Sequence, residues 1–264
     1  MSVNNEQIVS QTNQQSKLSI EVVSVSKTYH QKTAIKDITF SVHAGEFVAV
    51  LGPSGAGKTT LFRCMVGLLK PDHGHVSLLG NNITQLHRSQ RRSMAVIFQQ
   101  FNLVNRISAL DNVLAGRLGH TPAWRGWLKQ FTRQDRLLAL DCLNRVGLIN
   151  KAMQRADTLS GGEQQRVAIA RALAQQPNVI IADEPVASLD PKIGSEILDI
   201  LYNICKKDGV AIICSLHQLQ FAQKYADRIV GLANGRLVVD SNTQSFDANL
   251  AAQLYGNSGL TEMR

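Results

Sequence analysis

The stretch Gly52-Pro53-Ser54-Gly55-Ala56-Gly57-Lys58-Thr59-Thr60 fits the phosphate-loop pattern G-x-x-x-x-G-K-[ST]. An apolar run, Phe47–Leu51, precedes it and a helix-like stretch, Thr60–Val66, follows it, which is the setting that the motif requires. Glycines let successive backbone N–H groups point at phosphate oxygens, and the helix adds its positive dipole end. Lys58 can reach the outer phosphates, and the Thr59 hydroxyl can ligate Mg²⁺. A glycine-rich structural turn is the alternative, but the full pattern and its flanks predict binding of a nucleoside triphosphate.

A second candidate is the pair Asp183-Glu184, which ends the apolar run Val179–Ala182. In phosphate-loop proteins an acid at the end of a buried strand lies beside the loop, so Asp183 is expected to hold Mg²⁺. Glu184 would then orient or deprotonate the attacking water. An ordinary turn after a strand is the alternative, and it loses weight because the phosphate loop is also present.

The third candidate is Leu159-Ser160-Gly161-Gly162-Glu163-Gln164-Gln165-Arg166. Ser160 is a favourable N-cap, and Glu163 three residues later completes a capping box, so a helix is expected to begin here. Two glycines at the start leave backbone N–H groups unshielded, which makes a second anion site. This second site could face the same phosphate as Lys58 only if it came from another subunit.

Together these motifs resemble the ATP-binding-cassette (ABC) family from about Leu18 to Leu237. The order is that of the family: Tyr29, Gly52–Thr60, Gln99, Leu159–Gln165, Asp183-Glu184, Ser188-Leu189-Asp190 and His217. The resemblance implies ATP and Mg²⁺ as cofactors and a head-to-tail homodimer with two ATPs sandwiched between the subunits. Each ATP would lie on Lys58 of one chain and on Ser160 and Gly162 of the other. It also implies two transmembrane permease subunits and an extracytoplasmic solute-binding protein.

The resemblance assigns a role to each motif. Tyr29 would stack on adenine, Gln99 would touch Mg²⁺ and the water and sense the membrane partner, Asp190 would contact the opposite phosphate loop, and His217 would hydrogen-bond the γ-phosphate. The expected catalytic residues are thus Lys58, Gln99, Glu184 and His217. The expected metal ligands are Thr59, Gln99 and Asp183. The expected nucleotide-binding residues are Tyr29, Gly52–Thr60, Ser160, Gly161, Gly162, Glu163 and Asp190. Three alternatives remain: Tyr29 as a core aromatic, His217 as a structural histidine, and Gln100 in place of Gln99.

The elements that must position these residues can also be predicted. Leu18–Val25 and Ile38–Val42 indicate early antiparallel strands, with His43–Glu46 as the hairpin turn into Phe47–Leu51. The runs 76–79, 94–98, 179–182, 210–214 and 228–232 indicate further strands, the last three buried and parallel. Asn234-Gly235 is a strong hairpin turn. From Asn102 to about Thr158, helical patterns at 109–118 and 134–146 dominate.

The expected fold class is therefore α/β, a phosphate-loop NTPase core of the ABC type with an antiparallel β-subdomain and an inserted helical subdomain at about 102–158. Residues 18–240 would form this ATP-binding domain. The polar residues 1–17 are expected to be a disordered tail, and residues 241–264 a helical C-terminal tail.

Composition and net charge narrow the expected location of the protein and the classes of its partners. No apolar run approaches the roughly 20 residues that span a bilayer, and the first residues contain no apolar segment of a secretion signal. The net charge of +8 suits phosphate ligands, nucleic acid or an anionic membrane surface. Aromatics are not interleaved along a basic stripe, so no nucleic-acid partner is expected. We expect a peripheral protein on the cytoplasmic face of the cell (inner) membrane.

A finer resemblance is to the phosphonate-import ATPases. It rests on Phe98–Arg106, on Gly119–Arg125 with its Thr-Pro-x-Trp-Arg segment, on Ala187–Pro191 and on Leu216–Gln218. Parts of these stretches lie in the helical lobe, which in this family meets the membrane subunit. They would therefore indicate which membrane subunit the chain binds, and only indirectly which solute is transported. Packing of the lobe is the alternative, with Trp124 and Trp127 in its core.

The expected function is to energise uptake of phosphonate or a related reduced-phosphorus anion such as phosphite. An importer ATPase for phosphate or another small solute is the nearest rival. A soluble cassette protein acting on DNA or ribosomes usually carries a tandem cassette or a long coiled coil, and this sequence has one cassette and no heptads. A small-molecule kinase with a phosphate loop would have no use for Leu-Ser-Gly-Gly-Glu.

Overall fold

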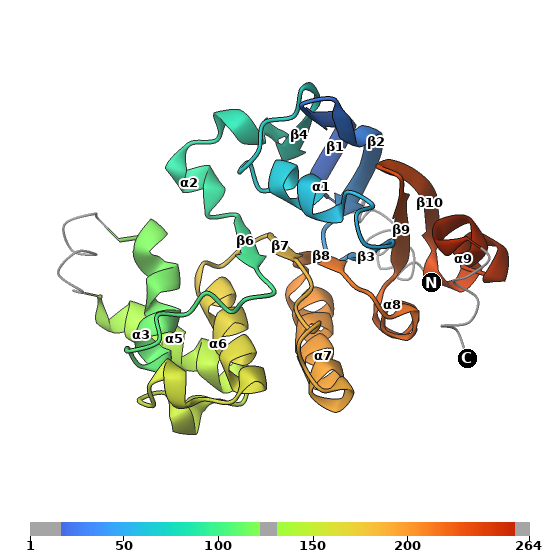
Figure 1. The fold of residues 1–264 in the computed structure, drawn as a ribbon. Helices are drawn as coiled ribbons and strands as arrows, with labels where there is room; N and C mark the ends of the chain where they lie inside the picture. Colours follow the sequence, from blue (N-terminus) through green and yellow to red (C-terminus); the bar gives the residue numbers. More distant parts are fainter. Residues whose placement is uncertain (1–16, 122–130, 257–264) are drawn as a thin grey trace, which may run out of the picture.

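The computed structural model describes residues 17–121 and 131–256, and these fold around two β-sheets (Figure 1). The first sheet is antiparallel, in the order β2-β1-β4-β5. Its strands are β1 (Leu18–Tyr29), β2 (Lys32–His43), β4 (His73–Leu78) and β5 (Asn81–Asn82). Alternate apolar side chains of β1 and β2 are buried, so one face of this sheet packs inward.

The second sheet has six strands in the order β10-β9-β3-β8-β7-β6. Its members are β3 (Phe47–Leu51), β6 (Met94–Ile97), β7 (Val179–Ala182), β8 (Ala211–Ser215), β9 (Arg228–Ala233) and β10 (Arg236–Asn242). All neighbours are parallel except β10, which pairs antiparallel with β9. Every residue of β3, β7 and β8 is buried, because helices or the other sheet cover both faces.

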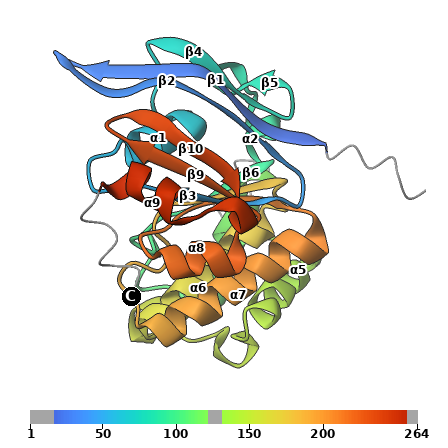
Figure 2. The same ribbon diagram turned by 90° about the vertical axis from the view of Figure 1, so that its right-hand side faces the viewer.

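Two apolar cores occupy the two faces of this sheet. Figure 2 shows the helices that lie on either side of its strands. On one face α1 (Lys58–Met65) lies between the two sheets and packs with residues such as Ile181 and Ile213. On the other face lie α6 (Gly161–Ala174), α7 (Pro191–Asp208) and α8 (Leu219–Tyr225). Because parallel strands end at one edge, the segments after β3, β7 and β8 converge there.

The helical lobe lies apart from the antiparallel sheet, at the lower left of Figure 1. It packs α3 (Ala109–Ala115) and α5 (Arg133–Arg145) against α6. Arg117 joins two of its parts, since its Nε lies 2.8 Å from Asp135 Oδ1 and its Nη1 donates to Ala174 O over 2.9 Å. Burial disfavours ionisation of Asp135, but hydrogen bonds from Arg117 and Thr132 outweigh it and lower the pKa of this carboxyl.

Short elements complete the described chain. They are η2 (Ile83–Gln85), α2 (Arg88–Arg91), η3 (Gly116–Gly119), η4 (Ile149–Lys151), η5 (Ala156–Thr158), η6 (Thr243–Ser245) and α9 (Ala248–Tyr255). Helix α9 falls within the expected C-terminal tail. The expected N-terminal tail up to residue 16, the segment 122–130 with both tryptophans, and residues 257–264 lie outside the described residues. No helix within the described ranges is long and apolar enough to cross a membrane.

One expected element is wrong. The turn at His43–Glu46 is not a hairpin, because β2 belongs to the antiparallel sheet and β3 lies between β8 and β9 in the other sheet. Its local chemistry is that of a hairpin turn, with Gly45 at φ 72° and the His43 N–H donating to Glu46 Oε2 over 2.8 Å. A turn sequence predicts that the chain reverses direction, but it does not predict which strand the following strand pairs with. The Asn234-Gly235 hairpin between β9 and β10 is confirmed.

Candidate nucleotide-binding and hydrolysis site

The phosphate loop joins β3 to α1 as the motif predicts, and glycine is required at two of its positions. Gly57 caps α1 with φ 101°, and a Cβ there would lie 2.7 Å from Ala34 O. Gly52 has φ 152°, and a Cβ there would lie 2.2 Å from Leu232 O. Both sites exclude any larger residue, so the loop keeps its backbone free to wrap an anion.

Lys58 lies under this loop with only 6% of its surface exposed. Its Nζ donates to Gly52 O over 2.5 Å and to Pro53 O over 3.3 Å. Burial lowers the pKa of Lys58, although the carboxylates of Glu184 and Asp183 oppose that effect. The ammonium therefore contacts the loop and interacts electrostatically with the two acids.

A cavity of about 690 Å³ opens beside the loop. This volume is in the range of small-molecule sites. It brings together four predicted features, namely Tyr29, the phosphate loop, Glu184 and His217. The complete lining is Tyr29, Lys32, Thr33, Ala34, Ser54, Gly55, Ala56, Gly57, Lys58, Thr59, Thr60, Glu184, His217, Asn234 and Gly235.

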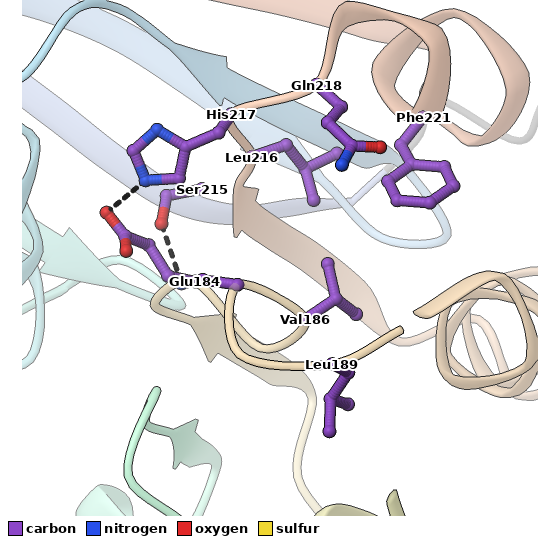
Figure 3. A pocket seen from close by; sticks show the side chains of 9 residues that line it. Glu184, Val186, Leu189, Ser215, Leu216, His217, Gln218 and Phe221 are labelled. Carbon is purple, nitrogen blue, oxygen red and sulfur yellow. Dashed lines mark hydrogen bonds and ion pairs between the residues drawn. The ribbon is translucent and has the colours of Figure 1, made fainter. Parts of the chain in front are cut away.

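Glu184 and His217 face each other across the edge of the sheet (Figure 3). His217 Nε2 lies 2.7 Å from Glu184 Oε1. Glu184 also has φ 52°, a left-handed conformation that costs a non-glycine residue on the order of 1–2 kcal/mol. Such a conformation persists only where the surrounding structure holds it, and strained residues of this kind are common at functional sites. A smaller cavity of about 190 Å³ lies on the far side of this pair, lined in part by Val186, Leu216 and Phe221.

Asp183 offers the oxygen ligand expected for Mg²⁺. Burial raises the pKa of Asp183, and a hydrogen bond from Ser215 partly opposes that rise. Mg²⁺ prefers oxygen ligands and is usually held by one or two carboxylates together with substrate phosphates. Among the described residues no group of three or more His, Cys, Asp or Glu side chains could hold a metal ion by itself. A carboxylate and the Thr59 hydroxyl beside a phosphate site therefore fit this ion.

Four expected site features do not line either cavity: Asp183, Gln99, the Ser160–Glu163 segment and Asp190. The part of the phosphate loop that lines the larger cavity begins at Ser54, so Gly52 and Pro53 are outside both linings as well. Gln99 is exposed just after β6, and Asp190 caps α7 by accepting the Lys192 N–H over 2.9 Å. Ser160 and Glu163 form the predicted capping box at the start of α6, which is confirmed. Gly162 packs so closely against α7 that a Cβ would lie 2.5 Å from Ile193 Cγ2.

Sequence reasoning missed two parts of the site. The Asn234-Gly235 turn was predicted as a hairpin, but its contact with the phosphate loop, where the Gly235 N–H donates to Ala56 O over 3.2 Å, was not. Ser215 was also missed. Its only signal is a small polar residue at the end of an otherwise apolar strand, two positions before His217.

Comparison with known proteins decides the family. A family model described as "ABC transporter" matches residues 35–187, more than half of the chain. The chain belongs to the ABC transporter family. It is the ATP-binding cassette of that family, an ABC transporter ATPase, and its two-sheet fold with an inserted helical lobe is the ABC cassette fold.

Curated relatives of this ABC cassette match over nearly its whole length. "Phosphonates import ATP-binding protein PhnC" of Escherichia coli strain K12 is 47% identical over 252 residues, covering 92% of this chain and 96% of the relative. The protein of the same name from Shigella dysenteriae serotype 1 is 48% identical over the same length and with the same coverage.

Solved ABC cassettes share the fold. A dimeric post-hydrolysis structure of the cassette MJ0796, bound to ADP and Pi, is 33% identical with a TM-score of 0.74, covering 86% of this chain and all of the other. The ADP conformation of the cassette MJ1267 has a TM-score of 0.79, covering 93% of this chain and 98% of the other, but at 23% identity it supports the fold alone.

Proposed function

We propose that this ABC cassette is the ATP-hydrolysing subunit of an importer for phosphonate or a related reduced-phosphorus anion such as phosphite. The observation that carries the proposal is the 47% identity to phosphonates import ATP-binding proteins over 92% of the chain. The match spans the helical lobe as well as the nucleotide site, and the lobe is the part expected to meet the membrane subunit.

The residues that line the cavity support separate roles for the predicted site residues. Phosphates would bind to the N–H groups of the loop, to Lys58 and to the start of α1, while Tyr29, 40% exposed at the rim, would stack on adenine. When bound, Mg²⁺ would neutralise charge on the phosphate oxygens, and Thr59, Asp183 and Gln99 would hold it.

Hydrolysis would depend on the acid and the histidine opposite the loop. Glu184 would orient the attacking water and accept its proton, and His217 would hydrogen-bond the γ-phosphate. The geometry supports these roles, since the two side chains lie 2.7 Å apart and line the same cavity as the phosphate loop.

A second copy of the chain would complete each site. The capped start of α6 at Ser160–Glu163 and the Asp190 cap of α7 offer anion-binding backbone away from the cavity of the same chain. A head-to-tail homodimer would bring Ser160, Gly161 and Gly162 of one copy onto the phosphates held by Lys58 of the other. The dimeric structure of the cassette MJ0796, at 33% identity, supports a dimer of this chain.

The importer would contain two transmembrane permease subunits and an extracytoplasmic solute-binding protein, with this chain docked at the cytoplasmic face of the inner membrane. The described chain supplies no membrane-crossing helix, so the path for the anion would belong to the permease. Closure of the cassette dimer on ATP, and its release after hydrolysis, would drive the permease.

Uptake of labelled phosphonate, phosphite and phosphate tests the proposal. Cells would carry the natural permease and binding protein with either the wild-type chain or its Glu184→Gln variant. We expect phosphonate or phosphite uptake to collapse in the variant while phosphate uptake stays at the wild-type level. Loss of phosphate uptake, or of another solute's uptake alone, would contradict the proposed cargo and leave the ATPase role standing.

A further inference from the structure

Ser215 is the last residue of β8 and is fully buried, and its hydroxyl contacts both acidic residues of the site. Ser215 Oγ donates to Asp183 Oδ1 over 3.0 Å and accepts the Glu184 N–H over 2.8 Å (Figure 3 shows the second contact). A serine hydroxyl has one hydrogen to donate, and here that hydrogen goes to a carboxylate. The Ser215 hydroxyl therefore acts as a hydrogen-bond donor and as an acceptor at the same time.

The strand geometry explains how this position makes both contacts. β7 and β8 are parallel neighbours, with Ala182 opposite Cys214, so Asp183 and Ser215 follow as the next pair. Side chains alternate between faces, which puts Asp183 and Ser215 on the face of Ile181 and Ile213. That face packs against α1, the helix that begins at the phosphate loop.

The Ser215 hydroxyl also replaces a backbone oxygen as hydrogen-bond acceptor at the point where β7 leaves the sheet. The Asp183 N–H still donates to a backbone oxygen, Ile97 O, over 2.8 Å. The next N–H, that of Glu184, donates to the Ser215 side chain, and Glu184 turns to φ 52° there. Its carboxylate then meets His217, two residues beyond Ser215. Glu184 is thus held at its backbone by Ser215 and at its carboxylate by His217.

We propose that Ser215 is a positioning residue for ATP hydrolysis, whose hydroxyl fixes the Asp183 carboxylate and the Glu184 backbone in their places beside the phosphate loop. The proposal rests on the roles of Asp183 and Glu184 in the proposed function. Ser215 is 0% exposed, so it would act through these two residues and not by contacting a ligand itself. Groups that orient metal-holding side chains typically change metal affinity or activity by about 10- to 100-fold when removed.

Ser215→Ala, Ser215→Thr and the control Ser19→Ala test the proposal. Ser19 is a buried serine of β1 at 2% exposure, in the sheet that lies away from the acids, so its variant reports the loss of a buried hydroxyl alone. We expect Ser215→Ala to lower kcat about 10- to 100-fold with little change in the KM for ATP. Ser215→Thr keeps the hydroxyl and should restore most of kcat, and Ser19→Ala should behave as wild type.

A binding measurement separates positioning from catalysis. The protein is saturated with AMP-PNP, a non-hydrolysable ATP analogue, and Mn²⁺ is titrated while the electron paramagnetic resonance signal of free Mn²⁺ is followed. We expect the Kd for Mn²⁺ to rise about 10-fold in Ser215→Ala and to stay at the wild-type value in Ser215→Thr. If Ser215→Ala does not fold, Ser215→Cys, with its weak S–H donor, replaces it and should show the same direction of change.

Wild-type kcat and wild-type Mn²⁺ affinity in Ser215→Ala would overturn the proposal, as would a lowered thermal midpoint with both values unchanged in the folded protein. Asp183→Asn is measured in parallel. If Asp183→Asn also binds Mn²⁺ normally, the proposed role of Asp183 fails. If Asp183→Asn loses Mn²⁺ while Ser215→Ala does not, the site assignment stands and only the role of Ser215 is lost.

Discussion

Glu184 shows at the scale of one residue how the fold prepares a group for chemistry. It follows β7 in a strained left-handed conformation, and its side chain is only 21% exposed and lies 2.7 Å from His217 Nε2. A carboxylate held in this way has lost most of its freedom before any ligand arrives. If Glu184 positions the attacking water as proposed, little further ordering is needed for that step.

Replacing Glu184 by Gln keeps the size of the side chain and removes its ability to accept a proton. We expect ATP binding to persist while turnover falls about 10²- to 10⁴-fold, as is typical for loss of a general base. ATP should therefore trap a closed dimer, visible as a doubled mass in size-exclusion chromatography with light scattering. Glu21→Gln, on β1, is the matched control. Wild-type turnover in Glu184→Gln would exclude the water-orienting role.

At the scale of elements, the β9–β10 hairpin supports the phosphate loop from the side. Gly235 of its turn donates to Ala56 O in the loop and accepts the Lys36 N–H of β2 over 2.7 Å. The turn thereby ties the antiparallel sheet, the parallel sheet and the loop together at one point. A Cβ on Gly235 would lie 2.6 Å from Ala34 O, so the close approach depends on glycine.

Gly235→Ala should disturb this junction in two ways, through its φ of 73° and through the clash with Ala34 O. We expect a loss of about 1–3 kcal/mol in the free energy of unfolding and weaker ATP binding. Gly80→Ala is the matched control, because Gly80 has φ 78° but no atom lies within 4 Å of where its Cβ would be, so it reports the φ cost alone. Urea unfolding and nucleotide titration measure both effects. Equal losses in the two variants would refute the role of the close contact.

At the scale of the whole molecule, the two helix starts that we propose bind anions lie in different parts of the chain. α1 begins at the cavity between the two sheets, and α6 begins in the region of the helical lobe (Figure 1). The cavity lining contains the first start and none of Ser160–Glu163. A site that uses both starts therefore needs two chains, and a symmetric pair would form two such sites.

Mixing two inactive variants tests this arrangement. Lys58→Ala removes the ammonium that we propose binds phosphate, and Ser160→Arg blocks the start of α6, so each homodimer should hydrolyse no ATP. In a mixed dimer one site combines Lys58 of one copy with Ser160 of the other, and random pairing should recover at most about a quarter of the wild-type activity. The ATPase rate at varied mixing ratios measures it. If no ratio recovers activity, the sandwiched dimer loses its main support.

Much of this protein could be predicted where the physics is local. The phosphate loop, the strand before Asp183-Glu184 and the capping box at Ser160 and Glu163 are specified by residues within a few positions of one another. Hydrogen bonds of a cap, positive φ values of glycine and apolar runs all act over that range. These features were accordingly predicted with the correct type and position.

Only the tertiary structure decided how distant segments meet. The turn at His43–Glu46 has the sequence of a hairpin, yet β3 pairs with β8 and β9 because its fully apolar strand is buried between parallel neighbours. In the same way the contacts of Ser215 and of Gly235 join residues more than 30 and more than 170 positions apart. The sequence alone determined which groups could do chemistry; strand order in the sheet, which no short stretch encodes, decided which of them share a site.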